Sequence, residues 1–194
     1  MTIQKTIAII AFPNCGTTML AGIMECFGIP MTGENRWEGN WEDKDIVWGL
    51  RDGYFDKTVA ERNAQYDIWG FKAPYAFDFL EKTKVGLRNP VYLAIWKDPY
   101  SVAQRRFDNT DIVETMQTTL NLMSMSVRKM EESEIDVHML SYQRALSNPS
   151  EFINKMLGIV DIEVTKEQIA RANEFIVPNT TSNWRYPHKQ VVRY

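Results

Sequence analysis

A buried strand, a tight loop and an amphipathic helix follow one another at the start of the chain, and this order constrains the fold more than any other feature. Residues 6–12 are almost continuously apolar, as in a strand covered on both faces. Pro13, Asn14 and Gly16 break this run, and apolar residues then recur at helical spacing until Gly28. Such a unit is typical of α/β proteins that bind a phosphate group at a helix N-terminus.

Further strands and helices alternate along the rest of the chain. This alternation predicts a parallel sheet with right-handed crossovers. We therefore expect an α/β, three-layer, P-loop-like fold with four to five central strands flanked by helices, in one domain spanning residues 1–194. The predicted strands after the first are 68–73, 90–96 and 137–141, and the predicted helices are 17–27, 42–50, 100–107, 111–132, 149–157 and 165–175.

Three of the predicted strands end in polar side chains that suit an anion. Asn14 follows the first strand, Lys72 ends the second and Lys97 follows the third. Ligands of open parallel sheets bind at the carboxyl ends of the strands. The sequence therefore predicts an anion-binding site at that edge.

Composition excludes several classes of protein. A net charge of −3 and a pI near 5.5 argue against a nucleic-acid partner. No stretch approaches the ~20 apolar residues of a membrane span, so we expect no membrane partner and a cytoplasmic location. The two cysteines, Cys15 and Cys26, have no metal-ligand spacing around them, and we expect no metal.

The loop at residues 12–18 is the predicted phosphate site. Its backbone N–H groups precede a helix, and Thr17 and Thr18 add hydroxyl donors. Alternatively, either threonine caps the helix and no ligand binds. No lysine follows Gly16, which disfavours an ordinary ATP-binding P-loop, and Ala21 stands where a cysteine phosphatase needs arginine.

The sequence resembles the sulfotransferase family in several short segments that occur in family order. The loop reads Phe-Pro-Asn-Cys-Gly-Thr-Thr-Met and is similar to the family's Pro-Lys-Ser-Gly-Thr-Thr-Trp. Trp-Gly-Phe-Lys-Ala-Pro is similar to its Trp-Gly-x-Lys-Asp-Pro, and Ser-Tyr-Gln to its Ser-Tyr-Glu. The similar segments are residues 12–19, 41–47, 69–74, 92–107, 141–149, 175–178 and, more weakly, 184–185.

This resemblance implies binding of 3′-phosphoadenosine 5′-phosphosulfate (PAPS) and release of the product nucleotide PAP, without a metal. The implied activity is transfer of a sulfuryl group to a hydroxyl, on a small-molecule or carbohydrate acceptor. Lys97 and Arg105 occupy the family's 3′-phosphate positions, and Arg185 lies in the segment similar to its C-terminal cofactor loop. The loop residues implied to bind the cofactor are Pro13, Asn14, Cys15, Gly16, Thr17 and Thr18.

One departure bears on catalysis. The family has Lys or Arg where this chain has Asn14, and an amide donates hydrogen bonds but brings no charge to the transferring group. Two alternatives to a sulfotransferase follow. One is a PAP- or PAPS-binding protein with reduced or no turnover, and the other is a different nucleotide-dependent transferase or kinase.

Glu42 is the candidate general base, and Lys72 is the candidate cation for the sulfuryl oxygens. Several family members have a glutamate in this region. Alternatively, Glu42 is a solvated charge at a helix start, where carboxylates are favoured, and Lys72 forms an ordinary salt bridge at the sheet edge.

Two groups of apolar side chains have a functional and a structural interpretation. Trp37, Trp41 and Trp48 either form a wall or lid over the acceptor or cover the side of a small core. The methionines of the long helix are expected in its packed face. These are Met116, Met123, Met125 and Met130.

Overall fold

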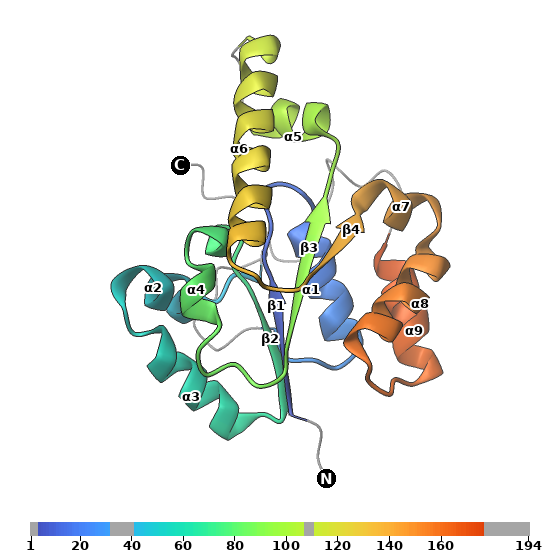
Figure 1. Cartoon of the computed structure of the whole chain (residues 1–194). Helices are drawn as coiled ribbons and strands as arrows, with labels where there is room; N and C mark the ends of the chain where they lie inside the picture. The colour runs from blue at the N-terminus through green and yellow to red at the C-terminus, as the bar shows by residue number, and fades with distance from the viewer. Residues whose placement is uncertain (1–3, 32–40, 107–110, 177–194) are drawn as a thin grey trace.

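Four parallel strands form a single sheet at the centre of the protein (Figure 1). The computed structural model describes residues 4–31, 41–106 and 111–176. The strand order is β2–β1–β3–β4, so the chain crosses over between each pair of neighbours. This arrangement confirms the predicted α/β class and its parallel sheet. The strands are β1 Lys5–Ile9, β2 Ile68–Lys72, β3 Pro90–Trp96 and β4 Val137–Ser141.

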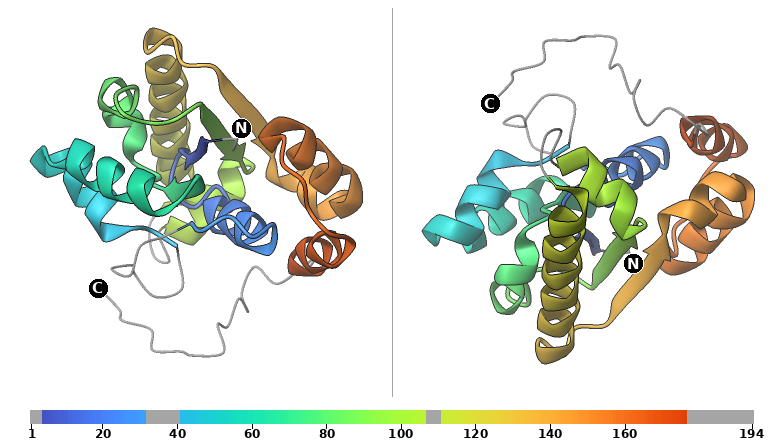
Figure 2. Two further views of the ribbon diagram at one scale, coloured as in Figure 1. Left: turned by 90° about the horizontal axis from the view of Figure 1, so that it is seen from below. Right: turned by 90° about the horizontal axis from the view of Figure 1, so that it is seen from above.

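Helices cover both faces of this sheet. One apolar cluster joins it to α1, α8 and α9, and a second joins it to α2, α3, α5 and α6, so the described chain forms three layers (Figures 1 and 2). The helices are α1 Thr17–Cys26, α2 Lys44–Asp52, α3 Phe55–Gln65, α4 Leu80–Thr83, α5 Pro99–Arg106, α6 Ile112–Glu132, α7 Tyr142–Ser147, α8 Pro149–Val160 and α9 Lys166–Phe175, with a short 3-10 helix η1 at Ala76–Asp78.

Strand β1 lies between β2 and β3 in the sheet, and helices packed on both sides of the sheet bury its two faces. Ile7 and Ile9 point into the cluster below α1, while Ala8 and Ile10 belong to the cluster on the other face. Lys5 begins the strand, and its ammonium group donates to the carbonyl oxygens of Val160, at the end of α8, and of Asp161. The apolar run at the start of the sequence therefore becomes the centre of the protein.

The structure departs from the sequence predictions at several elements. Strand β1 ends at Ile9, and residues 10–12 continue as buried chain, in which the N–H of Ile10 still donates to the carbonyl oxygen of Leu93 in β3. Helices α3, α4 and α7 and the short helix η1 were not predicted. Strand β4 lies at the sheet edge with one neighbour, so only Leu140 of it is buried.

The methionines of α6 are also less buried than expected. Met130 is 3% exposed, but Met125 is 48% exposed. Met116 and Met123 are half-buried. Met123 packs against the same core cluster as Met130, so the prediction of a packed methionine face is wrong for Met125 alone among the residues that are clearly exposed. None of the described helices is both long and apolar enough to cross a membrane.

Candidate active site at the carboxyl edge of the sheet

The loop after β1 turns through two left-handed residues before α1 begins. Asn14 has a φ of 66° and Gly16 a φ of 106°. Gly16 occupies the N-cap position, and in the described part of the chain no side chain caps the helix. The alternative in which Thr17 or Thr18 caps α1 is therefore wrong. The first turn of α1 is left with N–H groups that suit an anion.

Tyr142 makes a side chain at position 16 impossible without rearrangement. A Cβ added to Gly16 would lie 2.4 Å from Cδ2 of Tyr142, the first residue of α7. The same ring lies below Lys97, whose Nζ is 5.3 Å from its centroid. Tyr142 thus connects the loop to the end of β3.

Lys72 ends β2 beneath the start of α1. Only 2% of this residue is exposed, and its Nζ lies 3.1 Å from Oε1 of Glu42. It also donates to the hydroxyl of Thr18 at 3.2 Å. Desolvation by burial lowers the pKa of Lys72, the Glu42 carboxylate opposes this, and the nearby positive charge of Arg105 lowers the pKa further. A candidate cation, a candidate base and the loop helix are therefore in direct contact.

Glu42 is held in place by its own backbone and by its neighbour in the chain. Its backbone forms an isolated parallel bridge with Lys72, so the segment extends the edge of β2. The carboxylate of Asp43, which is 1% exposed, accepts from the N–H groups of Asp45 and Ile46 and thereby caps α2.

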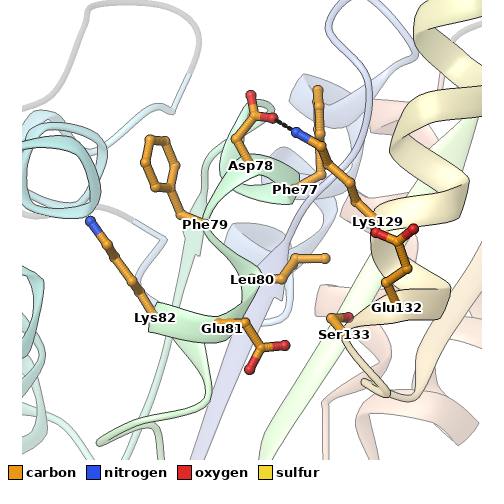
Figure 3. Close-up of a pocket in the computed structure, with 9 residues that line it drawn as sticks. All are labelled: Phe77, Asp78, Phe79, Leu80, Glu81, Lys82, Lys129, Glu132 and Ser133. Atoms are coloured by element: carbon orange, nitrogen blue, oxygen red, sulfur yellow. Dashed lines mark hydrogen bonds and ion pairs between the residues drawn. The ribbon is translucent and has the colours of Figure 1, made fainter.

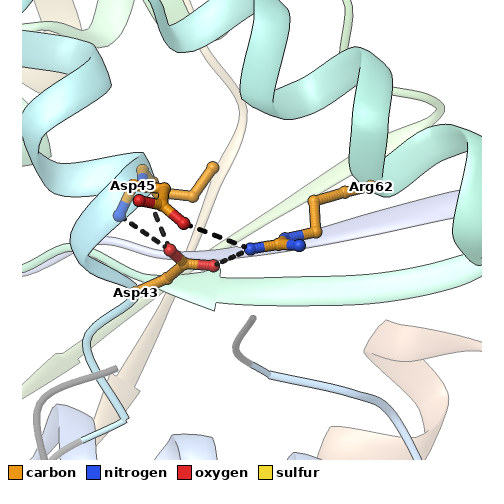
Figure 4. A network of polar contacts seen from close by, with 4 residues as sticks. Asp43, Asp45 and Arg62 are labelled. Carbon is orange, nitrogen blue, oxygen red and sulfur yellow. Dashed lines mark hydrogen bonds and ion pairs between the residues drawn. The ribbon is translucent and has the colours of Figure 1, made fainter. Parts of the chain in front are cut away.

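Arg62 of α3 completes this anchor. Its Nη2 lies 3.2 Å from Oδ2 of Asp43 and 3.7 Å from Oδ2 of Asp45 (Figure 4). The guanidinium of Arg62 is largely buried, so this ion pair is shielded from solvent. Helices α2 and α3 therefore fix the residue next to Glu42 rather than leaving a solvated helix start.

Lys97 and Arg105 lie on the other side of the loop. Burial lowers the pKa of Lys97, the charge of Arg105 lowers it further, and Asp98 and Cys15 oppose the shift. Asp98 accepts from the N–H of Ser101 and from Gln143 Nε2, both at 2.8 Å. Its oxygens thereby cap α5 and tie it to α7.

Arg105 links the two sides of the site electrostatically. Its charge lowers the pKa of Lys72, of Lys97 and of Tyr142, although burial sets the net upward shift of Tyr142. Lys72 thus contacts the first turn of α1 through Thr18, and the ring of Tyr142 places Lys97 next to the loop. The charge of Arg105 acts on both lysines. The predicted residues of the loop, of both strand ends and of α5 come together here, together with Glu42.

Other predicted residues lie elsewhere. Arg185 and Trp37 are outside the described residues. Trp41 packs edge to face on Phe175 with ring centroids 6.1 Å apart, which favours the structural interpretation for this residue. Trp48 lies on α2 and is 36% exposed.

Sequence reasoning did not assign a role to Tyr142, Asp43 or Arg62. Tyr142 carried a signal, because it belongs to the Ser-Tyr-Gln segment that resembles the family. Asp43 follows Glu42 directly, but the sequence does not indicate that the Asp43 carboxylate is buried or that it pairs with Arg62. Arg62 lies on a helix that was not predicted, and no local pattern relates it to Asp43.

A hollow of about 390 Å³ lies between η1, α4 and the C-terminal end of α6 (Figure 3). Lys129 pairs with Asp78 and lies over the ring of Phe77. Lys82 lies over Phe79 and donates to the carbonyl oxygen of Leu50. None of the predicted site residues lines this hollow.

Solved structures of sulfotransferases are similar to this protein. The sulfotransferase domain of the Synechococcus olefin synthase matches with a TM-score of 0.61 at 11% identity, over 86% of this chain and 76% of that chain. The sulfotransferase domain of the curacin biosynthetic pathway matches with 0.58 at 12% identity, over 87% and 77%. A sulfotransferase of Mycobacterium avium matches with 0.53 at 13% identity, over 91% and 68%.

In sequence, the chain matches no protein-family model and no curated protein. The structural likeness nevertheless shows that the chain has a sulfotransferase-like fold. The predicted fold relationship is thereby confirmed.

The Arg62–Asp43 anchor makes a testable prediction. Arg62→Met should lower the free energy of unfolding by about 3 kcal/mol, because it removes the cation from a buried carboxylate. Arg51→Met is the matched control. Arg51 pairs with Asp52, but both side chains are exposed to solvent, so this change should alter the free energy of unfolding far less than Arg62→Met does. Urea unfolding measures both, and equal losses would show that the Arg62 pair is an ordinary surface contact.

Proposed function

We propose that this protein is a sulfotransferase that moves a sulfuryl group from PAPS to a hydroxyl of a small-molecule or carbohydrate acceptor. One observation carries the proposal: the buried ammonium group of Lys72 contacts the first turn of α1 at the carboxyl edge of the sheet, and Lys97 lies next to the same loop over the ring of Tyr142. The sulfotransferase-like fold supports it independently.

The charge of the site fits a nucleotide with two separate anionic groups. Arg105 disfavours the charged forms of both Lys72 and Lys97, so it repels each of the two lysines. Bound phosphate and phosphosulfate groups would relieve this repulsion. PAPS carries such groups at the 3′ and 5′ positions of one nucleoside.

Two groups of residues would hold the cofactor. The N–H groups of Gly16, Thr17 and Thr18 would bind the 5′ end, where the dipole of α1 favours an anion. Pro13, Asn14 and Cys15 would shape the turn that presents these groups. On the other side of the loop, Lys97 and Arg105 would bind the 3′-phosphate. Arg185 is assigned to the cofactor by the sequence resemblance alone.

Glu42 and Lys72 would carry the chemistry. PAPS supplies the activated sulfuryl group, and in the transfer the acceptor oxygen bonds to sulfur while the bond to the 5′-phosphate oxygen breaks. Glu42 would take the proton of the acceptor hydroxyl. Lys72, already beneath the first turn of α1, would supply the positive charge that Asn14 does not.

A PAP- or PAPS-binding protein without turnover is the second candidate. The uncharged Asn14 favours it, and so does the Glu42–Lys72 ion pair of 3.1 Å. In this ion pair the carboxylate of Glu42 is engaged by Lys72 and not by an acceptor hydroxyl. The two candidates share a nucleotide site and differ only in turnover.

The assignment of the 3′-phosphate contact is tested with two nucleotides. Arg105→Ala should weaken PAP binding about ten- to a hundredfold, because a charge-assisted hydrogen bond is lost. AMP lacks the 3′-phosphate, so its weaker binding should hardly change. Arg171→Ala on α9 is the control and should affect neither ligand. Calorimetric titration measures all three, and equal losses of PAP and AMP by Arg105→Ala would refute the assignment.

Turnover is tested by restoring the missing cation. Asn14→Lys should raise sulfuryl transfer or PAPS hydrolysis and leave PAP affinity within a few-fold. Glu42→Gln should lower the same rate by about 10²–10⁴, with PAP affinity unchanged. The release of PAP from PAPS reports both rates. Failure of Asn14→Lys to raise the rate would indicate that Lys72 already supplies the charge, whereas a Glu42→Gln enzyme with full activity would exclude Glu42 as the base.

A further inference from the structure

The ammonium group of Lys72 is shared between a carboxylate and the first turn of α1. Its Nζ lies 3.1 Å from Oε1 of Glu42 and donates to the hydroxyl of Thr18 at 3.2 Å. The side chain of Lys72 is 3% exposed, so these protein groups, and not bulk water, surround the charge. The carboxylate of Glu42 therefore lies where an anionic ligand of Lys72 would also have to bind.

The backbone of Glu42 is fixed, but its side chain has room to move. The bridge to Lys72 and the buried pair of Asp43 with Arg62 hold the backbone on both sides of the residue. The side chain of Glu42 is nevertheless 22% exposed, so it borders solvent on one side. Rotation about its side-chain torsions can therefore separate the carboxylate from Lys72 without any movement of the sheet or of α2.

Lys72 needs an anionic partner whether the partner is a side chain or a ligand. Burial lowers the pKa of Lys72 and the charge of Arg105 lowers it further, while the carboxylate of Glu42 opposes both. In such a poorly solvated place two anions repel each other strongly, so a second anion at Lys72 competes with Glu42. The site is therefore suited to exchange one anionic partner of Lys72 for another.

We propose that the ion pair of Glu42 and Lys72 is a latch that opens when the sulfuryl group of the donor binds. Lys72 then contacts the sulfuryl oxygens, and the carboxylate of Glu42 is released for the acceptor hydroxyl. PAP has no sulfuryl group, so the latch stays closed when PAP binds. The inference rests on the proposed function, because that function assigns Lys72 to the sulfuryl group and Glu42 to the acceptor. The latch thus holds Glu42 away from the acceptor until the donor is in place.

Calorimetric titration of the full chain with PAPS and with PAP, in the absence of an acceptor, tests the latch. In the wild-type protein the sulfuryl group reaches Lys72 only by breaking an ion pair, so PAPS should bind within about threefold of PAP. Glu42→Gln removes the competing charge. PAPS should then bind at least about tenfold more tightly than PAP, whose own affinity should not change.

Glu81→Gln is the matched control for the loss of a carboxylate. Glu81 also pairs with a lysine, Lys84 at 2.9 Å, but both side chains are exposed. This change should leave the affinities for both nucleotides as they are. A Glu42→Gln protein that binds PAP without any gain for PAPS would overturn the latch and leave the proposed function standing. A wild-type chain that binds neither nucleotide would overturn both.

Crystal structures of the wild-type protein test the same exchange without a variant. With PAP bound, the distance between Lys72 Nζ and Glu42 Oε1 should stay near 3.1 Å. With PAPS bound, Lys72 should contact the sulfuryl oxygens and the Glu42 carboxylate should have turned away, while the pair of Asp43 with Arg62 remains. An intact pair of Glu42 and Lys72 beside a bound sulfuryl group would overturn the proposal.

Discussion

The buried ammonium group of Lys72 is the feature on which the candidate site depends. It stands at the end of β2, nearly without solvent, and it is bound by Glu42 and Thr18. Burying a charge is costly unless it is paired and hydrogen-bonded. The carboxylate of Glu42 pairs with this ammonium group, and its position is fixed by the backbone bridge to Lys72 and by the neighbouring Asp43–Arg62 ion pair. A buried cation so close to a helix N-terminus suits an anionic ligand better than it suits the packing of a core.

The contact between Lys72 and the first turn of α1 also bears on the role of Asn14. In the loop, this residue provides the left-handed turn that an asparagine tolerates well, but no charge. Lys72 lies near enough to contact the first turn of α1, so the positive charge reaches the loop from a neighbouring strand. The two candidate functions differ in whether the positive charge of Lys72 is sufficient for sulfuryl transfer. In both, the nucleotide site is the same.

Much of the fold could be predicted from the sequence because its strongest patterns are local. The apolar run before Pro13 and the helical spacing after it define β1 and α1, and Lys72 and Lys97 mark strand ends that must share one edge. Contacts between distant segments were not predictable. The collision of Tyr142 with any side chain at position 16, and the pairing of Arg62 with Asp43, depend on how helices dock on the sheet. The exposure of Met125 on α6 was mispredicted because the spacing of apolar residues along a helix does not by itself show which of them face the sheet.

The most direct test of the account is calorimetric titration of the full chain with PAP and then with ADP, which carries a 5′-diphosphate but no 3′-phosphate. The account predicts PAP binding at micromolar affinity or better. ADP should bind at least about a hundredfold more weakly, because the charged contacts of Lys97 and Arg105 are lost. Equal affinity for the two nucleotides, or no binding of PAP, would contradict it.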